Sequence, residues 1–195
     1  MNYRCNREQE NLEDVQECHS SVIIVEEARI IGMYGDIDFE KTAEVIHALD
    51  HFGMDEDNKQ PVRFNISTPG GDLVNALAIY DAMMELRSKG VEIHTKGVGE
   101  VSSAGVCLIA AGSKRVMGPN CRLMIHGLYS TFNGTIAEIE DEIRETKIRE
   151  KQYIKILKDH SELTEEQYQH FIDSGKNVFI SAESALKFGL IDEIL

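Results

Sequence analysis

The sequence has 195 residues, of which 42% are hydrophobic, and this predicts one globular domain with a sizeable core. Its 34 acidic and 20 basic residues give a formal net charge of −14, which would repel a nucleic-acid backbone. Residues 1–16 are polar and acidic, and no segment approaches the roughly 18 apolar residues of a membrane-spanning helix. We therefore expect a cytoplasmic protein with neither a nucleic-acid nor a membrane partner.

The first half of the chain alternates short apolar runs with helical patterns. Strands are expected at Val22–Val25, Arg29–Tyr34 and Val62–Ile66. Helices are expected at Phe39–Phe52, where apolar residues recur at helical spacing after an acidic start, and at Leu73–Lys89. A turn that contains Pro-Gly-Gly joins the third strand to the second helix.

The second half continues this alternation. A strand is expected at Val91–Val98, a short apolar helix at Ala104–Ala111, and further strands at Arg115–Met117 and Arg122–His126. Gly134–His160 has a long helical pattern in which apolar residues lie among alternating charges. This pattern predicts a long, partly exposed helix.

Two shorter helices, Thr164–Ser174 and Ala182–Phe188, are expected near the end of the chain. Repeated strand, turn and helix units predict an α/β fold, in which ligands bind at the carboxyl ends of the strands. The sequence shows no internal repeat and no second domain. Residues 21–195 are therefore expected to form one domain, preceded by a flexible segment at residues 1–20.

Two strand-to-helix turns are candidates for chemistry: Pro69-Gly70-Gly71 and Ser102-Ser103-Ala104-Gly105. Where a tight turn opens a helix, free backbone N–H groups and the positive end of the helix dipole converge, which suits a developing oxyanion. Gly71 would let a carbonyl oxygen approach the backbone closely. The second turn presents a serine, although it lacks the Gly-x-Ser-x-Gly pattern of a nucleophile elbow. Neither turn has the glycine pattern of a nucleotide site.

Each of these features also has an ordinary structural interpretation. Serine is a frequent N-cap, so Ser102 and Ser103 would then only cap the following helix. A single histidine after an apolar run, as at His126, would then be a hydrogen-bonded core residue. His47 and His51 lie four residues apart, but no third ligand accompanies them, so a solvated helix face is favoured over a metal site.

The order of short motifs along the chain resembles one family. The motifs are Arg29-Ile30-Ile31, Gly35-Asp36-Ile37-Asp38, Ser67-Thr68-Pro69-Gly70-Gly71, Ala78-Ile79-Tyr80-Asp81, Ser102-Ser103-Ala104-Gly105, Pro119-Asn120, Met124-Ile125-His126, Ser181-Ala182-Glu183-Ser184-Ala185 and Phe188-Gly189-Leu190-Ile191-Asp192. In this order they are similar to ClpP, the proteolytic subunit of the Clp protease, from about Ile23 to the last residue. The resemblance implies a ClpP/crotonase-like fold with a protruding handle helix at about residues 134–160.

The resemblance also implies roles for individual residues. Ser103 matches the nucleophile, His126 the general base, and the backbone N–H groups of Gly71 and Ala104 the oxyanion hole. In such a serine endopeptidase the histidine takes the hydroxyl proton during attack on a peptide carbonyl and later passes it to the leaving amine. Among milder departures from the family, Ala104 replaces a usual methionine.

The third catalytic position departs from the family. Its aspartate matches Asn177 when Phe179-Ile180-Ser181-Ala182 is aligned. An asparagine oxygen can accept a hydrogen bond from the histidine, but it cannot offset an imidazolium, and this exchange costs about 10⁴ in turnover in a chymotrypsin-type triad. Asp173, four residues earlier, is the alternative third member. The missing charge motivates a second hypothesis, a non-catalytic or weakly active ring subunit.

The resemblance further implies an assembly and partners. Members of the family stack two heptameric rings into a tetradecamer, and a Clp-class AAA+ ATPase feeds them unfolded protein. The partner uses ATP, so no cofactor or metal is expected in the chain itself, and residues 1–20 would be an axial loop or a removed propeptide. A remoter alternative is a crotonase-like acyl-CoA enzyme, which shares the strand-turn-helix plan and an oxyanion hole built from backbone N–H groups.

Overall fold

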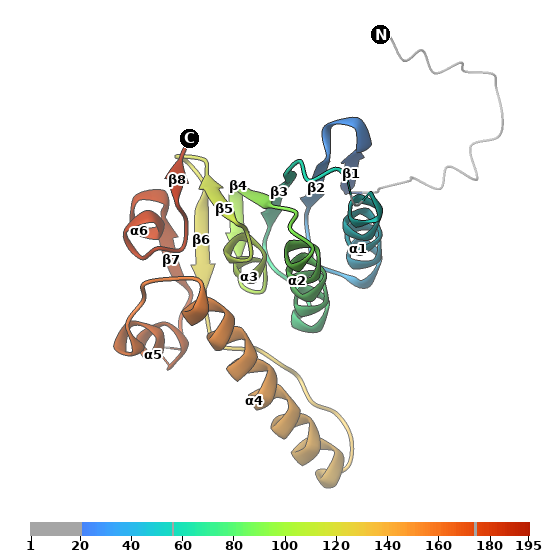
Figure 1. Cartoon of the computed structure of the whole chain (residues 1–195). Coiled ribbons are helices and arrows are strands. Elements are labelled where there is room, and N and C mark those ends of the chain that lie inside the picture. Colours follow the sequence, from blue (N-terminus) through green and yellow to red (C-terminus); the bar gives the residue numbers. More distant parts are fainter. Residues whose placement is uncertain (1–20, 56, 174) are drawn as a thin grey trace, which may run out of the picture.

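The computed structural model describes residues 21–195 except 56 and 174, and its centre is one mixed β-sheet (Figure 1). The expectation for residues 1–20 lies outside the described residues. The strands are β1 (Val22–Val25), β2 (Ile30–Tyr34), β3 (Val62–Thr68), β4 (Ile93–Ser102), β5 (Lys114–Met117), β6 (Arg122–Ile125), β7 (Val178–Ser181) and β8 (Glu193–Ile194). The helices are α1 (Phe39–Met54), α2 (Leu73–Ser88), α3 (Gly105–Ala110), α4 (Ile136–Asp159), α5 (Glu165–Asp173) and α6 (Ala182–Lys187), with a short 3-10 helix at Glu26–Ala28.

Parallel strands form the middle of the sheet. Strands β2, β3, β4 and β5 are consecutive parallel neighbours, whereas β1 pairs with β2 in the antiparallel direction and β8 adds to β5. Strand β6 leaves this order, because it runs parallel to the last residues of β4 and antiparallel to β7. The α/β fold expected from the sequence is confirmed.

Helices α1, α2 and α3 lie side by side against the sheet (Figure 1). Side chains alternate along β3, where Val62, Phe64 and Ile66 are buried and the intervening Arg63 is exposed. Because successive side chains of a strand point to opposite faces, one face of this strand builds the core and the other is polar. One hydrophobic core cluster joins the sheet with helices from both halves of the chain.

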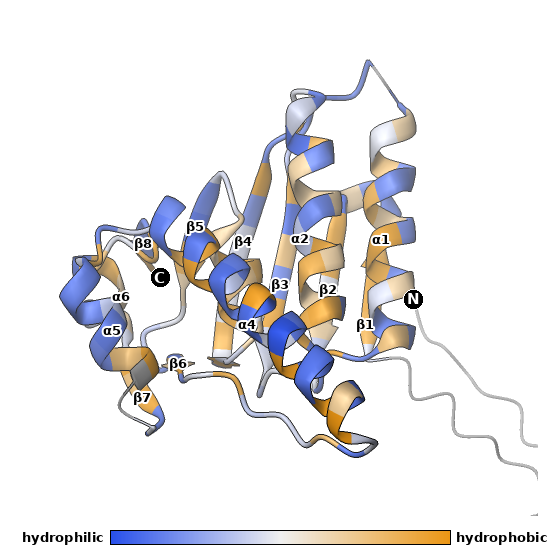
Figure 2. Ribbon diagram, turned by 90° about the horizontal axis from the view of Figure 1, so that it is seen from below, coloured by the Kyte–Doolittle hydropathy of each residue, from blue (hydrophilic) through white to orange (hydrophobic). Residues whose placement is uncertain are grey.

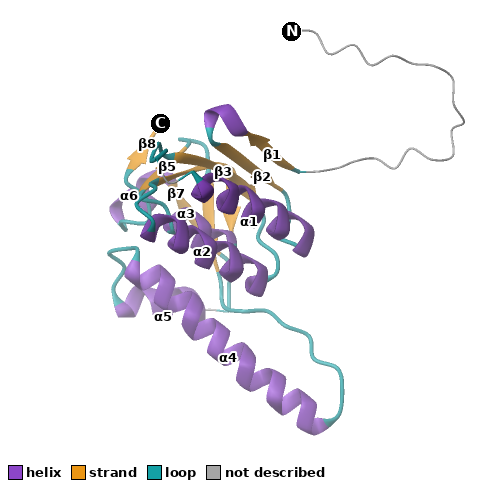
Figure 3. Ribbon diagram, turned by 45° about the vertical axis from the view of Figure 1, so that its right-hand side comes forward, coloured by secondary structure: helices purple, strands orange, loops and turns teal. Residues whose placement is uncertain are grey.

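Helix α4 extends away from the sheet (Figure 3). Its N-cap, Thr135, forms a capping box with Glu138: each side chain accepts a hydrogen bond from the other's backbone N–H. The buried residues of α4, namely Tyr153, Ile156 and Leu157, all lie in its second half. Figure 2 shows that hydrophilic and hydrophobic residues alternate along this helix. The long, partly exposed helix predicted from the sequence is therefore present. Among the described residues, no helix combines the length and the apolar character needed to cross a membrane.

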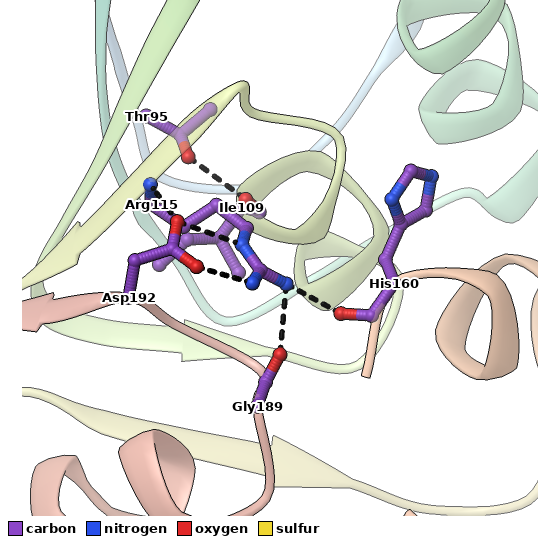
Figure 4. Close-up of polar contacts among 6 residues, drawn as sticks. All are labelled: Thr95, Ile109, Arg115, His160, Gly189 and Asp192. Atoms are coloured by element: carbon purple, nitrogen blue, oxygen red, sulfur yellow. Dashed lines mark hydrogen bonds and ion pairs between the residues drawn. The ribbon is translucent and has the colours of Figure 1, made fainter. Parts of the chain in front are cut away.

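Arg115 joins three segments at one end of the sheet (Figure 4). Its Nη1 donates to the carbonyl oxygens of His160 and Gly189, the second at 2.8 Å. Its Nε and Nη2 donate to the carboxylate of Asp192, which also accepts the Arg115 backbone N–H at 2.7 Å. These hydrogen bonds from Arg115 hold the pKa of Asp192 below its ordinary value. One guanidinium thus ties β5 to the end of α4 and to the segment before β8.

The Arg115→Lys variant is expected to lower the free energy of unfolding by about 1–3 kcal/mol. A lysine ammonium cannot reproduce the planar guanidinium fork, so the carbonyl oxygens of His160 and Gly189 cannot both keep their donor. The matched control is Arg144→Lys, because Arg144 pairs with Asp141 on the exposed surface of α4, where such an exchange changes stability by less than about 0.5 kcal/mol. Unfolding in urea, followed by circular dichroism, measures both variants, and equal losses would contradict this role of Arg115.

Candidate active site

Three turns that follow adjacent parallel strands bring the candidate residues together. Gly71 lies three residues after β3, Ser103 directly after β4, and His126 directly after β6. Both β3 and β6 pair in parallel with β4, so the carboxyl ends of the three strands meet at one edge of the sheet. The topology, and not proximity in the sequence, assembles this group of residues.

Ser103 and His126 are joined by a direct hydrogen bond. The distance between Ser103 Oγ and His126 Nε2 is 2.7 Å, and both side chains are half-buried. Ser103 has a φ of +54°, a left-handed conformation that non-glycine residues seldom adopt, and its N–H donates to the carbonyl oxygen of Met124 at 2.7 Å. In this arrangement a histidine can take the proton of an attacking serine.

The ordinary structural interpretations of the two candidate residues are wrong. The N-cap of α3 is Ala104, which has no side-chain hydrogen bond to the helix. The Ser102 hydroxyl donates to Glu100 Oε1 at 2.8 Å, and the Ser103 hydroxyl contacts His126, so neither serine caps α3. His126 is not a core residue either, because it is half-buried and lines a surface cavity together with Ser103.

Gly71 and Ala104 line the same cavity as Ser103 and His126. Within the described part of the chain, neither backbone N–H has a hydrogen-bond acceptor. Gly71 has a φ of +144°, and a Cβ added there would lie 2.4 Å from the carbonyl oxygen of Ile37 and 2.6 Å from its nitrogen. The backbone that lies close to Gly71 is that of Ile37. The approach of a carbonyl oxygen under attack to Gly71 stays a prediction.

The cavity beside Ser103 has a volume of about 320 Å³. One wall is the start of α2 with the turn before it, and another is a face of α4 that carries Thr146, Arg149 and Tyr153. Nothing in the local sequence singles out these three residues, because spacings of three and four are common to every helix face. Only the packing of α4 against the Ser103 turn shows which face lines the cavity.

Asn177 lies next to His126, just before β7. Strand β7 pairs with β6 in the antiparallel direction with Val178 opposite Ile125, and the next pair in this register is Asn177 opposite His126. Both of these residues line a second cavity. Asn177 is exposed, and in the described part of the structure no hydrogen bond joins it to the imidazole. Asp173, the alternative third member, is the last residue of α5, and its side chain lies outside the described part of the structure.

The two described cysteines, Cys107 and Cys121, are buried free thiols. Burial raises the pKa of both thiols, that of Cys121 to about 11, so they stay protonated near neutral pH and act as small core residues. Over the described ranges, no group of three or more His, Cys, Asp or Glu side chains is placed to hold a metal ion. His47 and His51 are both exposed, in agreement with a solvated helix face.

Comparisons with known proteins point to the same chemistry as the Ser103–His126 pair. The family model for Clp protease matches residues 13–195. ATP-dependent Clp protease proteolytic subunit 2 of Chlamydia abortus is 34% identical over 168 residues, which are 85% of this chain and 79% of that protein. The subunit 2 of Chlamydia pneumoniae and the subunit 1 of Chlamydia felis are each 34% identical, over 85% of this chain and 80% of their own length. The chain therefore belongs to the Clp protease family of serine peptidases.

Proposed function

We propose that this chain is a serine endopeptidase that hydrolyses peptide bonds of unfolded proteins, with Ser103 as nucleophile and His126 as general base. The observation that carries the proposal is the 2.7 Å hydrogen bond between Ser103 Oγ and His126 Nε2. The cavity beside this pair gives a peptide access to the hydroxyl, and Gly71 and Ala104 offer unused N–H groups at its edge. Placed donors of this kind stabilise a developing oxyanion.

In the proposed reaction a peptide carbonyl lies in the cavity next to Ser103. His126 Nε2 takes the hydroxyl proton while Oγ forms a bond to the carbonyl carbon, and the N–H groups of Gly71 and Ala104 donate to the oxygen that becomes negative. His126 then passes the proton to the leaving amine as the C–N bond breaks, which leaves an acyl-enzyme. Water activated by the same histidine hydrolyses the ester and restores Ser103.

Asn177 supports a second candidate function, that of a weakly active or non-catalytic ring subunit. Its amide oxygen has no charge to offset an imidazolium, and its side chain is exposed without a hydrogen bond to His126 in the described structure. We keep Asn177 ahead of Asp173 as the third member, and the pairing of Val178 with Ile125, the residues next to Asn177 and His126, supports this choice. The two candidate functions differ in whether Ser103 is an activated nucleophile.

A fluorophosphonate probe is expected to form an adduct on Ser103 of the purified protein, located by peptide mass spectrometry. The Asn177→Asp variant is expected to react about tenfold faster, because a carboxylate stabilises the imidazolium. We expect a smaller effect than the roughly 10⁴-fold of a buried aspartate, because solvent screens a charge at this exposed position. The matched control is Asn133→Asp, which adds the same charge on an exposed loop before α4 and should leave the rate unchanged.

Each outcome of this experiment separates the candidates. An adduct on Ser103 of the native chain favours the peptidase. An adduct that forms only in Asn177→Asp favours the weakly active or non-catalytic subunit, with an assembled site that lacks charge. No adduct on either protein contradicts the assignment of Ser103, and an equal acceleration in Asn133→Asp contradicts the placement of Asn177 beside the histidine.

The crotonase-like alternative rests only on a shared fold plan. A serine hydrogen-bonded to a histidine suits acyl transfer to a nucleophile better than enolate chemistry, and the family match is to a protease. Tight binding of coenzyme A, measured by calorimetry, would revive this alternative.

The assembly and the partners are part of the proposal. We place residues 21–195 in one domain that forms heptameric rings, two of them stacked as a tetradecamer, in the cytoplasm. The relatives' names, which contain the words "ATP-dependent" and "subunit", support self-association and a Clp-class AAA+ ATPase that uses ATP, with no cofactor in the chain itself. Exposed apolar side chains suit such contacts, among them Ile136 and Ile148 on α4 and Ile23 on β1.

A further inference from the structure

Helix α4 places one tyrosine hydroxyl against the backbone of Ser103. Tyr153 is 2% exposed, and its Oη donates to the carbonyl oxygen of Ser103 at 3.2 Å. The same carbonyl accepts the N–H of Val106 at 3.0 Å, and the N–H of Ser103 donates to the carbonyl of Met124 at 2.7 Å. Three elements, α3, α4 and β6, therefore hold the two peptide groups that flank the Ser103 side chain.

Ser103 needs this support because its backbone is strained. A φ of +54° is unfavourable for serine, and such a conformation persists only where the surroundings over-determine it. The carbonyl group and the side chain share the same Cα, so a rotation of the peptide plane also shifts Oγ. A change of this kind would alter the 2.7 Å contact between Oγ and His126 Nε2.

The Tyr153 hydroxyl is not needed to fill the core. A phenylalanine ring occupies nearly the same volume, and a buried hydroxyl costs free energy unless it forms a hydrogen bond. In the described structure, the Ser103 carbonyl is its only hydrogen-bond partner. Burial raises the pKa of Tyr153 well above its ordinary value, so the hydroxyl stays protonated and remains a donor.

We infer that Tyr153 is a positioning residue, whose hydroxyl holds the Ser103 carbonyl so that Oγ stays aligned with His126 and with the carbonyl under attack. This inference rests on the proposed function. It adds that the orientation of Ser103 Oγ depends on the packing of α4 against the Ser103 turn. Tyr153 also lines the cavity beside Ser103. Contact of its hydroxyl with substrate would change KM, whereas positioning of Ser103 changes kcat.

Tyr168 offers a matched control for the loss of a buried hydroxyl. It is 1% exposed, and its Oη shares a 2.8 Å hydrogen bond with Ser161 Oγ. Tyr168 belongs to α5 and does not line the cavity beside Ser103. The Tyr168→Phe variant therefore removes the same kind of group without a direct effect on the nucleophile.

The test compares Tyr153→Phe, Tyr168→Phe and the native chain, each full-length and purified, in peptide hydrolysis and in fluorophosphonate labelling. Tyr153→Phe is expected to lower kcat and the labelling rate by about tenfold with KM unchanged, since a displacement of about 1 Å at a reacting group costs up to about 10² in rate. Tyr168→Phe should keep both rates within about twofold of the native chain. Thermal unfolding is expected to shift by similar amounts in both variants.

Other results would overturn the inference in distinguishable ways. If the native chain is active and Tyr153→Phe has the same kcat and labelling rate, the positioning role of Tyr153 is refuted while the proposed function stands. A higher KM with unchanged kcat would assign the hydroxyl to substrate binding instead. If kcat and the labelling rate fell in both variants in proportion to the fraction of unfolded protein, the Tyr153 hydroxyl would contribute only to stability. A native chain that is neither labelled nor active would overturn the proposed function together with this inference.

Discussion

The Ser103→Ala variant is expected to lower peptide turnover by about 10²-fold or more. In subtilisin, loss of all three triad residues lowers kcat by about 2 × 10⁶, and loss of the aspartate alone lowers it by about 3 × 10⁴. The ratio of these values, about 10², is the contribution of serine and histidine that remains when the aspartate charge is missing. Because Asn177 matches the aspartate position in this chain, a loss of about 10² in turnover is the minimum that we expect for Ser103→Ala. Hydrolysis of a fluorogenic peptide by the purified variant measures it.

Ser102→Ala is the matched control for this experiment. Ser102 is the adjacent serine, it is 1% exposed, and its hydroxyl bonds to Glu100 instead of to the histidine. Its replacement should keep turnover within about threefold of native, with a modest loss of stability from the lost hydrogen bond. Equal activity of the two alanine variants would show that Ser103 is not the nucleophile.

The second large effect is expected for Gly71→Ala, which should lower kcat by about 10²–10³-fold. The added Cβ would lie 2.4 Å from the carbonyl oxygen of Ile37, and this neighbour is backbone, so the turn itself must move. Movement of the turn displaces the Gly71 N–H from the edge of the cavity beside Ser103. Steady-state kinetics, with folding checked by circular dichroism, measure the loss.

Gly90→Ala separates this effect from ordinary backbone strain. Gly90 also has a positive φ, +81°, but a Cβ there would meet nothing within 4 Å. At either position an alanine has an unfavourable free energy because φ is positive, whereas only Gly71→Ala also creates a steric clash. We expect Gly90→Ala to keep native kcat. A Gly71→Ala variant that turns over substrate at the native rate would exclude this N–H from the oxyanion hole.

Several elements were predictable because their patterns are local. Strand β1 has the predicted bounds, and α4 differs from its predicted range by two residues at its start and one at its end. Apolar spacing of three and four depends only on nearby residues, which is why the helices were found. Phe39 begins the apolar stripe of α1, yet its side chain is 76% exposed, whereas Leu49 and Phe52 farther along the helix are buried. Spacing identifies a stripe, but packing decides which of its residues are buried.

Other elements depended on distant partners and could not be predicted. Strand β4 was expected to end at Val98 but continues to Ser102, because Glu100–Ser102 pair with residues of β6. Strand β7 was not expected at all: among its four residues only Ile180 is buried, and it forms as the antiparallel partner of β6. Such short strands have a weak local pattern, and their hydrogen bonds come from another part of the chain.

The sequence by itself determined the α/β class, the order of the elements, the two glycine-containing turns and the choice of Ser103 and His126 as candidates. Those conclusions follow from local periodicity and from the order of short motifs. Only the tertiary structure decided that Ser103 and His126, 23 residues apart, share a hydrogen bond, and that Tyr153, 50 residues from Ser103, reaches its carbonyl. These contacts arise from strand pairing and helix packing, which join distant segments and leave no periodic pattern around any single residue.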